Sequence, residues 1–367
     1  KDLLMSERDL DLNALKMYSF LVFSKLEGAV TSGMIHLGDR LGLYGALANS
    51  PIALSCEQLA GKTSLHQRWV QEWLHNQAAA HLIEVTIEEN GDELYSLTPE
   101  AAVVLADENH PAFGMGMFHR LPQTMESLRA LPESFRTGLG YDYDSHGPEG
   151  AVGIERSFEP WSRSYLLPVV LPALDGAVES LMAGAQVADI GCGAGGAAVR
   201  MATAFPRSVV TGYDISRFAL DRALAKKAEQ QLSNVSFVDP RSTPLPEDES
   251  LDLITAFDCI HDMTHPQDVM GAIRRSLKPN GIWLLVDIKA LDTFAENMSK
   301  NPMASLMYGI SVLSCMSSAM SVAGGAGLGT LGLPESKARA MAQEAGFSRF
   351  RKLDTEHSLN AFYEVRP

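Results

Sequence analysis

The sequence has few basic residues for its length and few cysteines. Its 367 residues include 30 Lys and Arg against 45 Asp and Glu, a formal net charge of -15. This deficit argues against a nucleic-acid partner and against an anionic membrane surface, because both need a concentrated basic face. The four cysteines, at 56, 192, 259 and 315, have neither disulfide nor metal-ligand spacing. We therefore expect no metal site, and a reducing cytoplasm fits this cysteine usage.

Two further absences concern membranes and export. Residues 1–12 are acidic and lack an apolar core, so no signal peptide is visible and we expect the protein to stay inside the cell. From Asn301 to Pro334 there is no charged residue, a length that raises the question of a transmembrane helix. The many Ser and Gly residues in this stretch make lipid insertion poor. We expect a buried or mobile cover instead, and no membrane partner.

The most informative segment is 187–196, which reads Val-Ala-Asp-Ile-Gly-Cys-Gly-Ala-Gly-Gly. It predicts a buried strand that leads through a glycine loop into a helix. Gly191, Gly193 and Gly195 can take positive φ and let backbone amides approach a ligand. The spacing of Gly191, Gly193 and Gly196 satisfies G-x-G-x-x-G, so the loop alone allows NAD, FAD or S-adenosylmethionine (SAM).

Carboxylates distinguish this loop from an ordinary dinucleotide fingerprint. Asp189 stands two residues before the first glycine, where a NAD-type strand is normally apolar. Three later apolar runs also end in acids: 209–213 precedes Asp214, 235–238 precedes Asp239, and 251–257 precedes Asp258. A further apolar run, 282–286, follows Leu-Lys-Pro-Asn-Gly at 277–281. Five strands with helical spacers predict an α/β fold with a parallel, doubly wound sheet.

This order resembles the class I SAM-dependent methyltransferases over about residues 165–367, in the D-x-G-x-G-x-G loop, the acid that ends the second strand and the L-K-P-x-G turn. The resemblance implies that the glycines lie against SAM, Asp214 binds the ribose, Asp239 meets the adenine amino group and Asp189 faces the methionine amino group. The implied cofactor-binding set is Asp189, Gly191, Gly193, Gly195, Asp214, Ile215, Asp239, Pro240 and Asp258. The alternative for each Asp is a cap or turn residue at a strand end.

The N-terminal third predicts a winged helix. Helical periodicity covers 13–48, with Leu37, Leu41, Leu43 and Leu47 on the expected core face. A capped helix at 55–60 and a helical run at 64–84 follow, and 82–98 reads as a hairpin around Asn90-Gly91.

The charge of this region opposes binding to DNA. Residues 1–105 hold 7 Lys and Arg against 14 Asp and Glu, and the expected recognition helix carries Glu72 beside Arg68. Many small-molecule O-methyltransferases carry a winged helix as a dimerisation domain, so the resemblance implies a homodimer.

We expect three parts along the chain. These are a winged-helix dimerisation domain at 1–108, a helical connector and substrate-pocket segment at 109–165, and a Rossmann-like SAM-binding catalytic domain at 166–367. The last part carries an inserted lid at 295–333, for which the alternative is a helix pair in the dimer core. The predicted fold class is α/β, a Rossmann-like class I methyltransferase sheet with a mainly helical winged-helix N-terminal domain.

The tract 257–263, Phe-Asp-Cys-Ile-His-Asp-Met, resembles the I-C-H-D-W run of winged-helix O-methyltransferases, whose His is the general base. A hydroxyl that attacks a sulfonium methyl loses its proton, which a His near neutral pKa can take. His261 is therefore the first base candidate, with Asp262 beside it. Alternatively, both residues cap the next helix or line the adenosine site. Met263 replaces the Trp of the plant enzymes, and no unmistakable partner acid follows.

A second cluster of aromatic and polar residues occupies 140–148 and 154–161. Such a mixture suits a small anionic acceptor, with a fork from Arg156 to a carboxylate and rings that exclude water or face a sulfonium. The predicted substrate-binding residues are Tyr141, Tyr143, His146, Arg156, Phe158, Trp161 and Tyr308, and His146 is also a catalytic candidate. The alternative is a solvated loop with an ion pair of Glu155 to Arg156 or Arg163.

The leading hypothesis is a cytoplasmic, dimeric SAM-dependent methyltransferase for a small molecule, with S-adenosylhomocysteine as its product. A weaker resemblance to the methylthiohydroxybutyrate S-methyltransferases of dimethylsulfoniopropionate synthesis favours a small thioether or hydroxy carboxylate such as 4-methylthio-2-hydroxybutyrate. S-methylation there needs alignment and desolvation rather than a base. One alternative is an O-methyltransferase of an aromatic or polyketide-like metabolite with His261 as base. Others are a SAM-sensing winged-helix regulator and a NAD-dependent oxidoreductase, which lacks a recognisable hydride-transfer tract.

Overall fold

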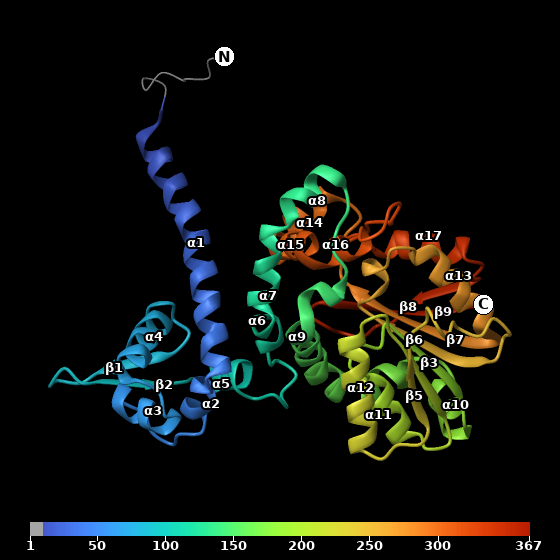
Figure 1. Cartoon of the computed structure of the whole chain (residues 1–367), viewed down its shortest axis with the longest axis horizontal. Coiled ribbons are helices and arrows are strands. Elements are labelled where there is room, and N and C mark those ends of the chain that lie inside the picture. The colour runs from blue at the N-terminus through green and yellow to red at the C-terminus, as the bar shows by residue number, and fades with distance from the viewer. Residues whose placement is uncertain (1–9) are drawn as a thin grey trace. The chain divides into compact units, whose positions relative to one another are not determined.

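The computed structural model describes residues 10–367, which divide into two compact units. The first consists of the chain up to Glu108 together with Phe113–Leu121, and the second of Asn109–Ala112 together with Pro122–Pro367 (Figure 1). The winged-helix domain predicted at 1–108 begins at residue 1, so its first nine residues lie outside the described residues. The three-part division of the chain stays a prediction.

The first unit has the mainly helical composition and the two-stranded wing of the predicted winged helix. Its strands pair antiparallel, with Glu84 opposite Ser96. The Ser55 side chain accepts from the Gln58 amide, and the Gln58 side chain bonds back to Ser55, so the predicted capped helix begins with a capping box. The elements are α1 (Leu12–Arg40), α2 (Leu43–Ala48), α3 (Cys56–Thr63), α4 (Gln67–Ala79), β1 (Glu84–Ile87), β2 (Glu93–Ser96), α5 (Pro99–Leu105) and α6 (Met115–His119).

The single helix predicted at 13–48 is interrupted. Gly42 takes a left-handed φ of 70° and separates α1 from α2. The break changes which side chains face inward, so Leu43 and Leu47 are buried while Leu37 and Leu41 are exposed. The predicted core face is therefore correct for its second half and wrong for its first half, because helical periodicity does not continue through a left-handed residue.

The second unit is built on a seven-stranded sheet with the order β5-β4-β3-β6-β7-β9-β8. Strands β5 to β7 run parallel, and β9 and β8 close the sheet antiparallel. This confirms the predicted class I methyltransferase fold. The strands are β3 (Gln186–Ile190), β4 (Val209–Tyr213), β5 (Val235–Val238), β6 (Leu251–Phe257), β7 (Leu277–Ile288), β8 (Arg349–Lys352) and β9 (Asn360–Arg366).

Strand β7 begins five residues earlier than the sequence predicts. Leu277 already pairs with Leu251, and the next paired position joins Ile282 to Leu253, so the Lys-Pro-Asn-Gly segment forms an irregularity inside the strand. A bulge of this kind holds extra residues on one strand without ending the ladder. The turn motif is therefore part of β7.

Helices cover both faces of this sheet (Figure 1). The first face buries Leu181, Ala198 and Ala223, from α10, α11 and α12, and the second buries Met270 and Ala338, from α13 and α17. Burial of both faces explains why the strands read as continuous apolar runs. The α-helices of the unit are α7 (Leu121–Glu126), α8 (Leu131–Thr137), α9 (Gly147–Trp161), α10 (Ala177–Ala183), α11 (Gly196–Ala204), α12 (Arg217–Glu229), α13 (Pro266–Ser276), α14 (Phe294–Lys300), α15 (Ala304–Ile310), α16 (Met316–Ala319) and α17 (Glu335–Glu344).

The uncharged stretch after β7 forms short helical segments. A π-helical turn, η7 (Ser311–Cys315), joins α15 to α16, and a second one, η4 (Ser162–Val170), follows α9. Within residues 10–367, no single helix has both the length and the apolar character to cross a membrane. One bent pair, Tyr143–Ala173 with Ala177–Ala183, passes the same test by length and composition. The role of 295–333 as a lid or as dimer core stays a prediction.

Candidate functional site

The glycine loop links β3 to α11 at the carboxyl edge of the sheet. Gly191, Gly193 and Gly195 all have positive φ, between 55° and 75°. A Cβ at Gly191 would lie 2.6 Å from Cys259 Cβ, and one at Gly195 would lie 2.6 Å from the Phe237 ring. At Gly193 a Cβ would meet no protein atom within 4 Å. Two glycines are thus required by packing, whereas Gly193 faces open space beside the first turn of α11.

Asp214 follows β4 and bonds to the glycine loop. Its Oδ2 accepts from the Gly193 amide and its Oδ1 from the Ser216 amide, each at 2.8 Å. A carboxylate has about four acceptor sites, so two amides leave room for further hydroxyl donors. Burial raises the pKa of Asp214, and the Ser216 and Gly193 amides partly offset this effect.

Asp189 lies inside β3, between Gly212 of β4 and Thr255 of β6. Its side chain is 1 % exposed. Oδ1 accepts from the Thr255 hydroxyl at 2.7 Å, while Oδ2 has no hydrogen-bond partner. Burial raises the pKa of Asp189 to about 7 against the lowering effect of the Thr255 hydrogen bond. A buried, unpartnered carboxylate oxygen below the loop needs a donor.

Asp239, which follows β5, is occupied by Arg241. The Arg241 guanidinium donates to both carboxylate oxygens, and its backbone amide donates to Oδ1. These hydrogen bonds lower the pKa of Asp239. The same guanidinium donates to the Ile215 carbonyl at 2.8 Å, and this hydrogen bond joins the turn after β4 to the turn after β5. Pro240 is the residue between Asp239 and Arg241 in the sequence. An adenine contact at Asp239 stays a prediction and requires Arg241 to share this carboxylate.

Asp258 directly follows β6 and has a strained conformation, with a φ of 47° that non-glycine residues rarely adopt. Its Oδ1 accepts from the Asn360 side chain of β9 at 2.5 Å. Burial raises the pKa of Asp258 to about 7, and the charge of Asp287 adds to the effect. Strain of this kind concentrates at functional sites.

His261 lies between two carboxylates at the same edge of the sheet. It is 2 % exposed, and its Nδ1 is 2.6 Å from Asp287 Oδ1 while its Nε2 is 2.9 Å from Asp262 Oδ1. Burial by itself lowers the pKa of His261, but the charges of Asp262 and Asp287 outweigh it and raise the pKa well above its ordinary range. Asp287 is the partner acid that sequence reasoning missed. Its signal was a carboxylate near the end of an apolar strand, like that of Asp189 in β3.

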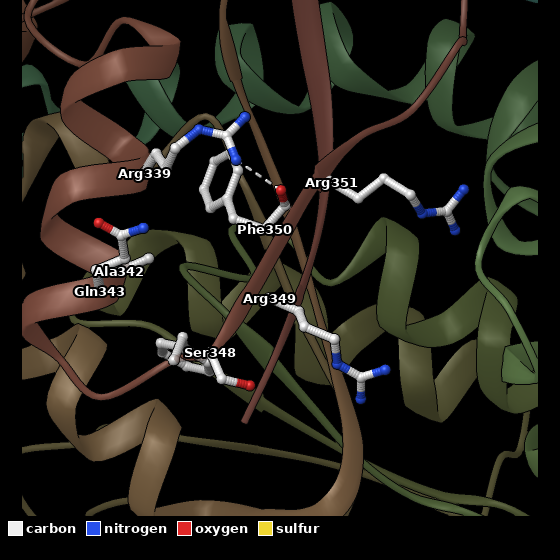
Figure 2. A pocket seen from close by; sticks show the side chains of 8 residues that line it. Arg339, Ala342, Gln343, Ser348, Arg349, Phe350 and Arg351 are labelled. Carbon is white, nitrogen blue, oxygen red and sulfur yellow. Dashed lines mark hydrogen bonds between the residues drawn. The ribbon is translucent and has the colours of Figure 1, made fainter.

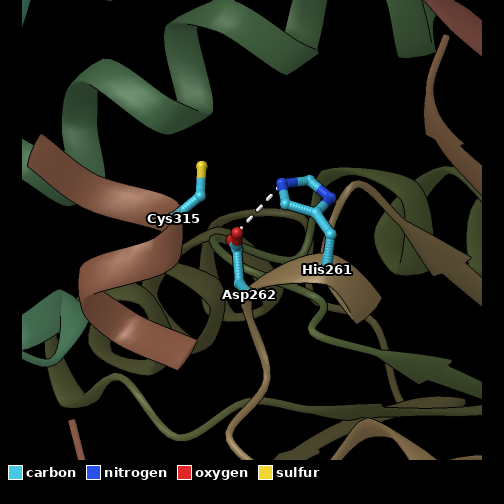
Figure 3. Close-up of side chains that lie close together, drawn as sticks. All are labelled: His261, Asp262 and Cys315. Carbon is cyan, nitrogen blue, oxygen red and sulfur yellow. Dashed lines mark ion pairs between the residues drawn. The ribbon is translucent and has the colours of Figure 1, made fainter. Parts of the chain in front are cut away.

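Tyr143 reaches this cluster from η3 (Tyr143–His146). Its hydroxyl donates to Asp262 Oδ2 at 2.5 Å and lies 3.8 Å from Cys315 Sγ. Figure 3 shows the Cys315 side chain on its helical segment, facing His261 and Asp262. One ligand-type atom from each of these three residues lies within 4.8 Å of the others, the spacing of a candidate metal cluster.

The remaining predicted acceptor residues lie in different surroundings. His146 is buried with its ring 6.3 Å from that of Tyr143. Trp161 is stacked on Phe362 with ring centroids 5.8 Å apart and is part of the core on one face of the sheet. Other placements are Tyr141, exposed and donating to the Ala130 carbonyl; Arg156, half-buried in α9; Phe158, packed against the sheet core; and Tyr308, exposed with its ring 5.7 Å from Phe294. Substrate contact stays a prediction for all of them.

A surface pocket of about 400 Å³ lies elsewhere, between α17 and β8 (Figure 2). Arg339 donates to the Phe350 carbonyl there and also pairs with Glu335. None of the residues that line this pocket is a predicted site residue. This pocket therefore does not coincide with the predicted site at the carboxyl edge of the sheet.

The described residues fit a SAM-like cofactor. The chain offers a loop with open space at Gly193, a ribose-type carboxylate with acceptor sites left at Asp214, and an orphaned buried oxygen at Asp189. These features lie at adjacent strand ends, where ligands of open α/β sheets bind.

Comparison with known proteins agrees with this geometry. Residues 181–346 match the family described as a methyltransferase domain, and residues 29–107 match the Rv2258c-like winged HTH domain. The chain therefore carries a SAM-dependent methyltransferase domain, which follows a winged-helix domain in the sequence.

Curated relatives match only part of the chain. The 27-O-demethylrifamycin SV methyltransferase of Amycolatopsis mediterranei is 34% identical over 110 residues, which cover 29% of this chain and 40% of that protein. The chain spans between 29% and 42% of the length of the curated relatives it matches.

Solved structures match over nearly the whole chain. Human N-acetylserotonin methyltransferase, in complex with SAM, has a TM-score of 0.65 and 18% identity, and covers 99% of both chains. A candidate O-methyltransferase from Nostoc punctiforme has a TM-score of 0.72 and 14% identity, and covers 95% of this chain and 98% of its own. At these identities the similarity establishes the fold. The cofactor class is SAM, as the fit of the loop and the family match both indicate.

Proposed function

We propose that the protein transfers a methyl group from SAM to a hydroxyl of a small molecule. The observation that carries this proposal is the buried acid–base cluster of His261, Asp262 and Asp287, reached by the Tyr143 hydroxyl. An attacking hydroxyl must lose its proton as the new bond forms, and a buried cluster of titratable groups is suited to receive it. The names of the similar structures, which include O-methyltransferases, support the same reaction class.

In this proposal the cofactor edge of the sheet binds and orients the methyl donor. When bound, SAM supplies an electrophilic sulfonium methyl group. The Gly193 amide and the first turn of α11 lie where the backbone can approach the cofactor closely. Asp214 accepts hydrogen bonds from the ribose hydroxyls, and the unpartnered oxygen of Asp189 accepts one from the methionine amino group. The burial of His261 and Asp287 keeps water away from the cluster.

A thioether acceptor has weaker support. A thioether has no proton to lose, so methyl transfer to sulfur would make no use of the His261 cluster. The small thioether or hydroxy carboxylate stays a prediction, and the excess of acidic residues over 1–105 disfavours the SAM-sensing regulator.

We also propose that the protein is a homodimer through its N-terminal unit. Helix α1 exposes apolar side chains along most of its length, a pattern that marks a protein–protein interface. These side chains are between 46 % and 73 % exposed: Leu12, Leu15, Met17, Tyr18, Phe20, Leu21, Val22, Phe23, Leu26 and Val30. Light scattering should give the mass of a dimer for the wild type. The double variant Phe20→Ser, Phe23→Ser should be monomeric, with Lys25→Ala as control, and a monomeric wild type would contradict the proposal.

The methyl transfer is tested by following S-adenosylhomocysteine release from SAM with a panel of phenols, alcohols and thioethers. His261→Asn should lower kcat for a hydroxyl acceptor about 10²-fold while the SAM Kd stays unchanged. His265→Asn is the matched control, because His265 is an exposed His four residues further along the same segment. Turnover of thioethers alone, unaffected by His261→Asn, would reject O-methylation. A DNA shift without any methyl transfer would favour the regulator.

A further inference from the structure

A short segment before α9 contacts residues that follow two different strands of the sheet. We call residues 140–146, which end in η3, the bridge. Its first residues are fixed on α16, because the Gly140 amide donates to the Met320 carbonyl at 2.9 Å and the Tyr141 amide donates to the Ser317 hydroxyl at 2.8 Å. A Cβ on Gly140 would lie 2.0 Å from the Ser317 carbonyl oxygen, so the two backbones are in close contact. The bridge therefore begins at a fixed position.

Two consecutive residues of the bridge contact the two sides of the candidate site. The Tyr143 hydroxyl donates to Asp262 Oδ2 at 2.5 Å, after β6. Asp144 accepts from the Ser216 hydroxyl with Oδ1 and from the Arg217 backbone amide with Oδ2 at 3.3 Å. Ser216 is the N-cap residue of α12, which follows β4. The bridge thus connects an acceptor-side carboxylate to the start of α12.

The start of α12 also holds the carboxylate expected to bind ribose. The Ser216 amide donates to Asp214 Oδ1, and the Gly193 amide donates to the other oxygen, each at 2.8 Å. Burial raises the pKa of Asp214 and the charge of Asp144 acts in the same direction, so the two carboxylates are close neighbours. Ser216 lies between them, with its amide on Asp214 and its hydroxyl on Asp144. A ligand that orders the Asp214 turn therefore also orders the donors that hold Asp144.

The position of Asp144 depends on these donors. Its side chain is 28 % exposed, and the Arg217 guanidinium lies 3.9 Å from Oδ2 and is 76 % exposed, so this ion pair contributes little. Inside the bridge, Asp142 Oδ1 accepts from both the amide and the hydroxyl of Ser145, which makes η3 a compact turn. A shift of Asp144 therefore also shifts Tyr143.

We propose that Asp144 is a positioning residue that makes acceptor binding depend on cofactor occupancy. The inference rests on the proposed function, although the identity of the group that takes the proton does not enter it. With SAM bound, the ribose hydroxyls order the Asp214 turn, the start of α12 holds Asp144, and Tyr143 stays against Asp262. By thermodynamic linkage, a bound acceptor strengthens cofactor binding by the same factor. We expect a factor of about ten, within the range of coupled sites.

The first experiment needs no acceptor. The full chain is labelled with 3-fluorotyrosine, followed by ¹⁹F NMR during titration with S-adenosylhomocysteine, and Tyr143→Phe assigns the resonance. The Tyr143 resonance should shift on saturation in the wild type and stay unchanged in Asp144→Ala. Asp221→Ala, which removes an exposed carboxylate from α12, is the matched control and should respond as the wild type does. A full response in Asp144→Ala, or none in the wild type, would overturn the proposal.

The second experiment uses the hydroxyl acceptor that the panel identifies. Its Kd is measured by calorimetry with and without S-adenosylhomocysteine, and the ratio should be about ten in the wild type and near one in Asp144→Ala. Ser216→Ala removes the hydroxyl that serves Asp144 but keeps the amide that serves Asp214, so it tests the same link if Asp144→Ala does not fold. A purely structural role would weaken both affinities and leave their ratio unchanged, and that result would overturn the proposal.

The two experiments separate this proposal from the proposed function. If the protein binds S-adenosylhomocysteine but methylates no hydroxyl, O-methylation is refuted, and the Tyr143 resonance still decides the role of Asp144. If a hydroxyl is methylated and the Tyr143 resonance does not respond to S-adenosylhomocysteine, the coupling is refuted and the proposed function stands.

Discussion

The two halves of the sheet's carboxyl edge are both acidic, but they use their acids differently. On the cofactor side, Asp214 accepts from two backbone amides, while Asp189 accepts from a Thr hydroxyl with one oxygen and has no partner for the other. On the acceptor side, Asp262 and Asp287 enclose a histidine. A carboxylate that keeps free acceptor sites can bind the hydroxyls and amino group of a ligand, whereas one that contacts a histidine can orient that side chain and take part in proton transfer. In the proposed function, the first kind of carboxylate binds the cofactor and the second kind serves the reaction.

The difference in construction is equally clear. The cofactor side is made from consecutive strand-to-helix turns, so its residues lie at strand ends in chain order. The acceptor side joins η3, the turn after β6, the end of β7 and the π-helical turn η7. Variants should therefore divide cleanly, with cofactor-side changes affecting SAM binding and acceptor-side changes affecting the rate.

The largest effect is expected for Gly195→Ala. A Cβ there would lie 2.6 Å from the Phe237 ring and 2.9 Å from Ala223 Cβ, at a φ of 75°. Left-handed strain and overpacking together should cost about 2–5 kcal/mol. Thermal unfolding should show the loss, and calorimetry should show no SAM binding. Gly193→Ala shares the positive φ but meets no protein atom, so it should be more stable than Gly195→Ala; equal stability of the two would contradict the packing argument.

Asp214→Ala should weaken SAM binding about 10²-fold, because it removes a charged acceptor from the ribose site. Calorimetry with SAM measures the Kd, and kcat at saturating SAM should change much less. Asp221→Ala, on the exposed face of α12, is the control. The division between the two sides breaks down if Asp214→Ala lowers kcat as much as His261→Asn does while SAM binding persists.

Asp189→Asn should change how stability depends on pH. The raised pKa of about 7 means that the folded protein keeps a proton that the unfolded chain loses near its ordinary value. Wild-type stability should therefore fall as pH rises through the interval from about 4 to 7. The Asn variant lacks this loss and should gain on the order of 2 kcal/mol over the wild type at pH 8 relative to pH 5. Denaturant unfolding at the two pH values measures it, and parallel curves would refute the buried charge.

The smallest effect is expected for Arg241→Ala. Arg241 occupies Asp239 at a half-exposed site, so the ion pair itself contributes little to stability. Its removal frees acceptor sites for the adenine amino group, and the SAM Kd should change by less than about tenfold. Arg217→Ala, at the first residue of α12, serves as the comparison. A complete loss of SAM binding would show that Arg241, rather than Asp239, holds the cofactor.

The sequence predicted most of this fold because its signals are local. Strand ends, glycine spacing and the Ser55 cap depend on neighbours within a few residues, and all appear at or near the predicted positions. Errors occurred where a single backbone conformation changed a longer pattern, at Gly42 in the first helix and in the irregular start of β7. The periodic spacing of apolar residues does not predict where the backbone departs from regular helix or strand geometry.

The candidate site divides in the same way. Asp189, the glycines and Asp214 could be proposed from chain order, since parallel strands bring successive turns to one edge. The pairing of His261 with Asp287 could not, because 26 residues and a helix separate them. The contact between Tyr143 and Asp262 spans 119 residues. Local pattern specified the strands, the cofactor loop and the identity of the acids. Packing of distant segments chose which acids remain open to a ligand and which enclose the histidine, because only the assembled sheet brings those charges within a few ångströms of one another.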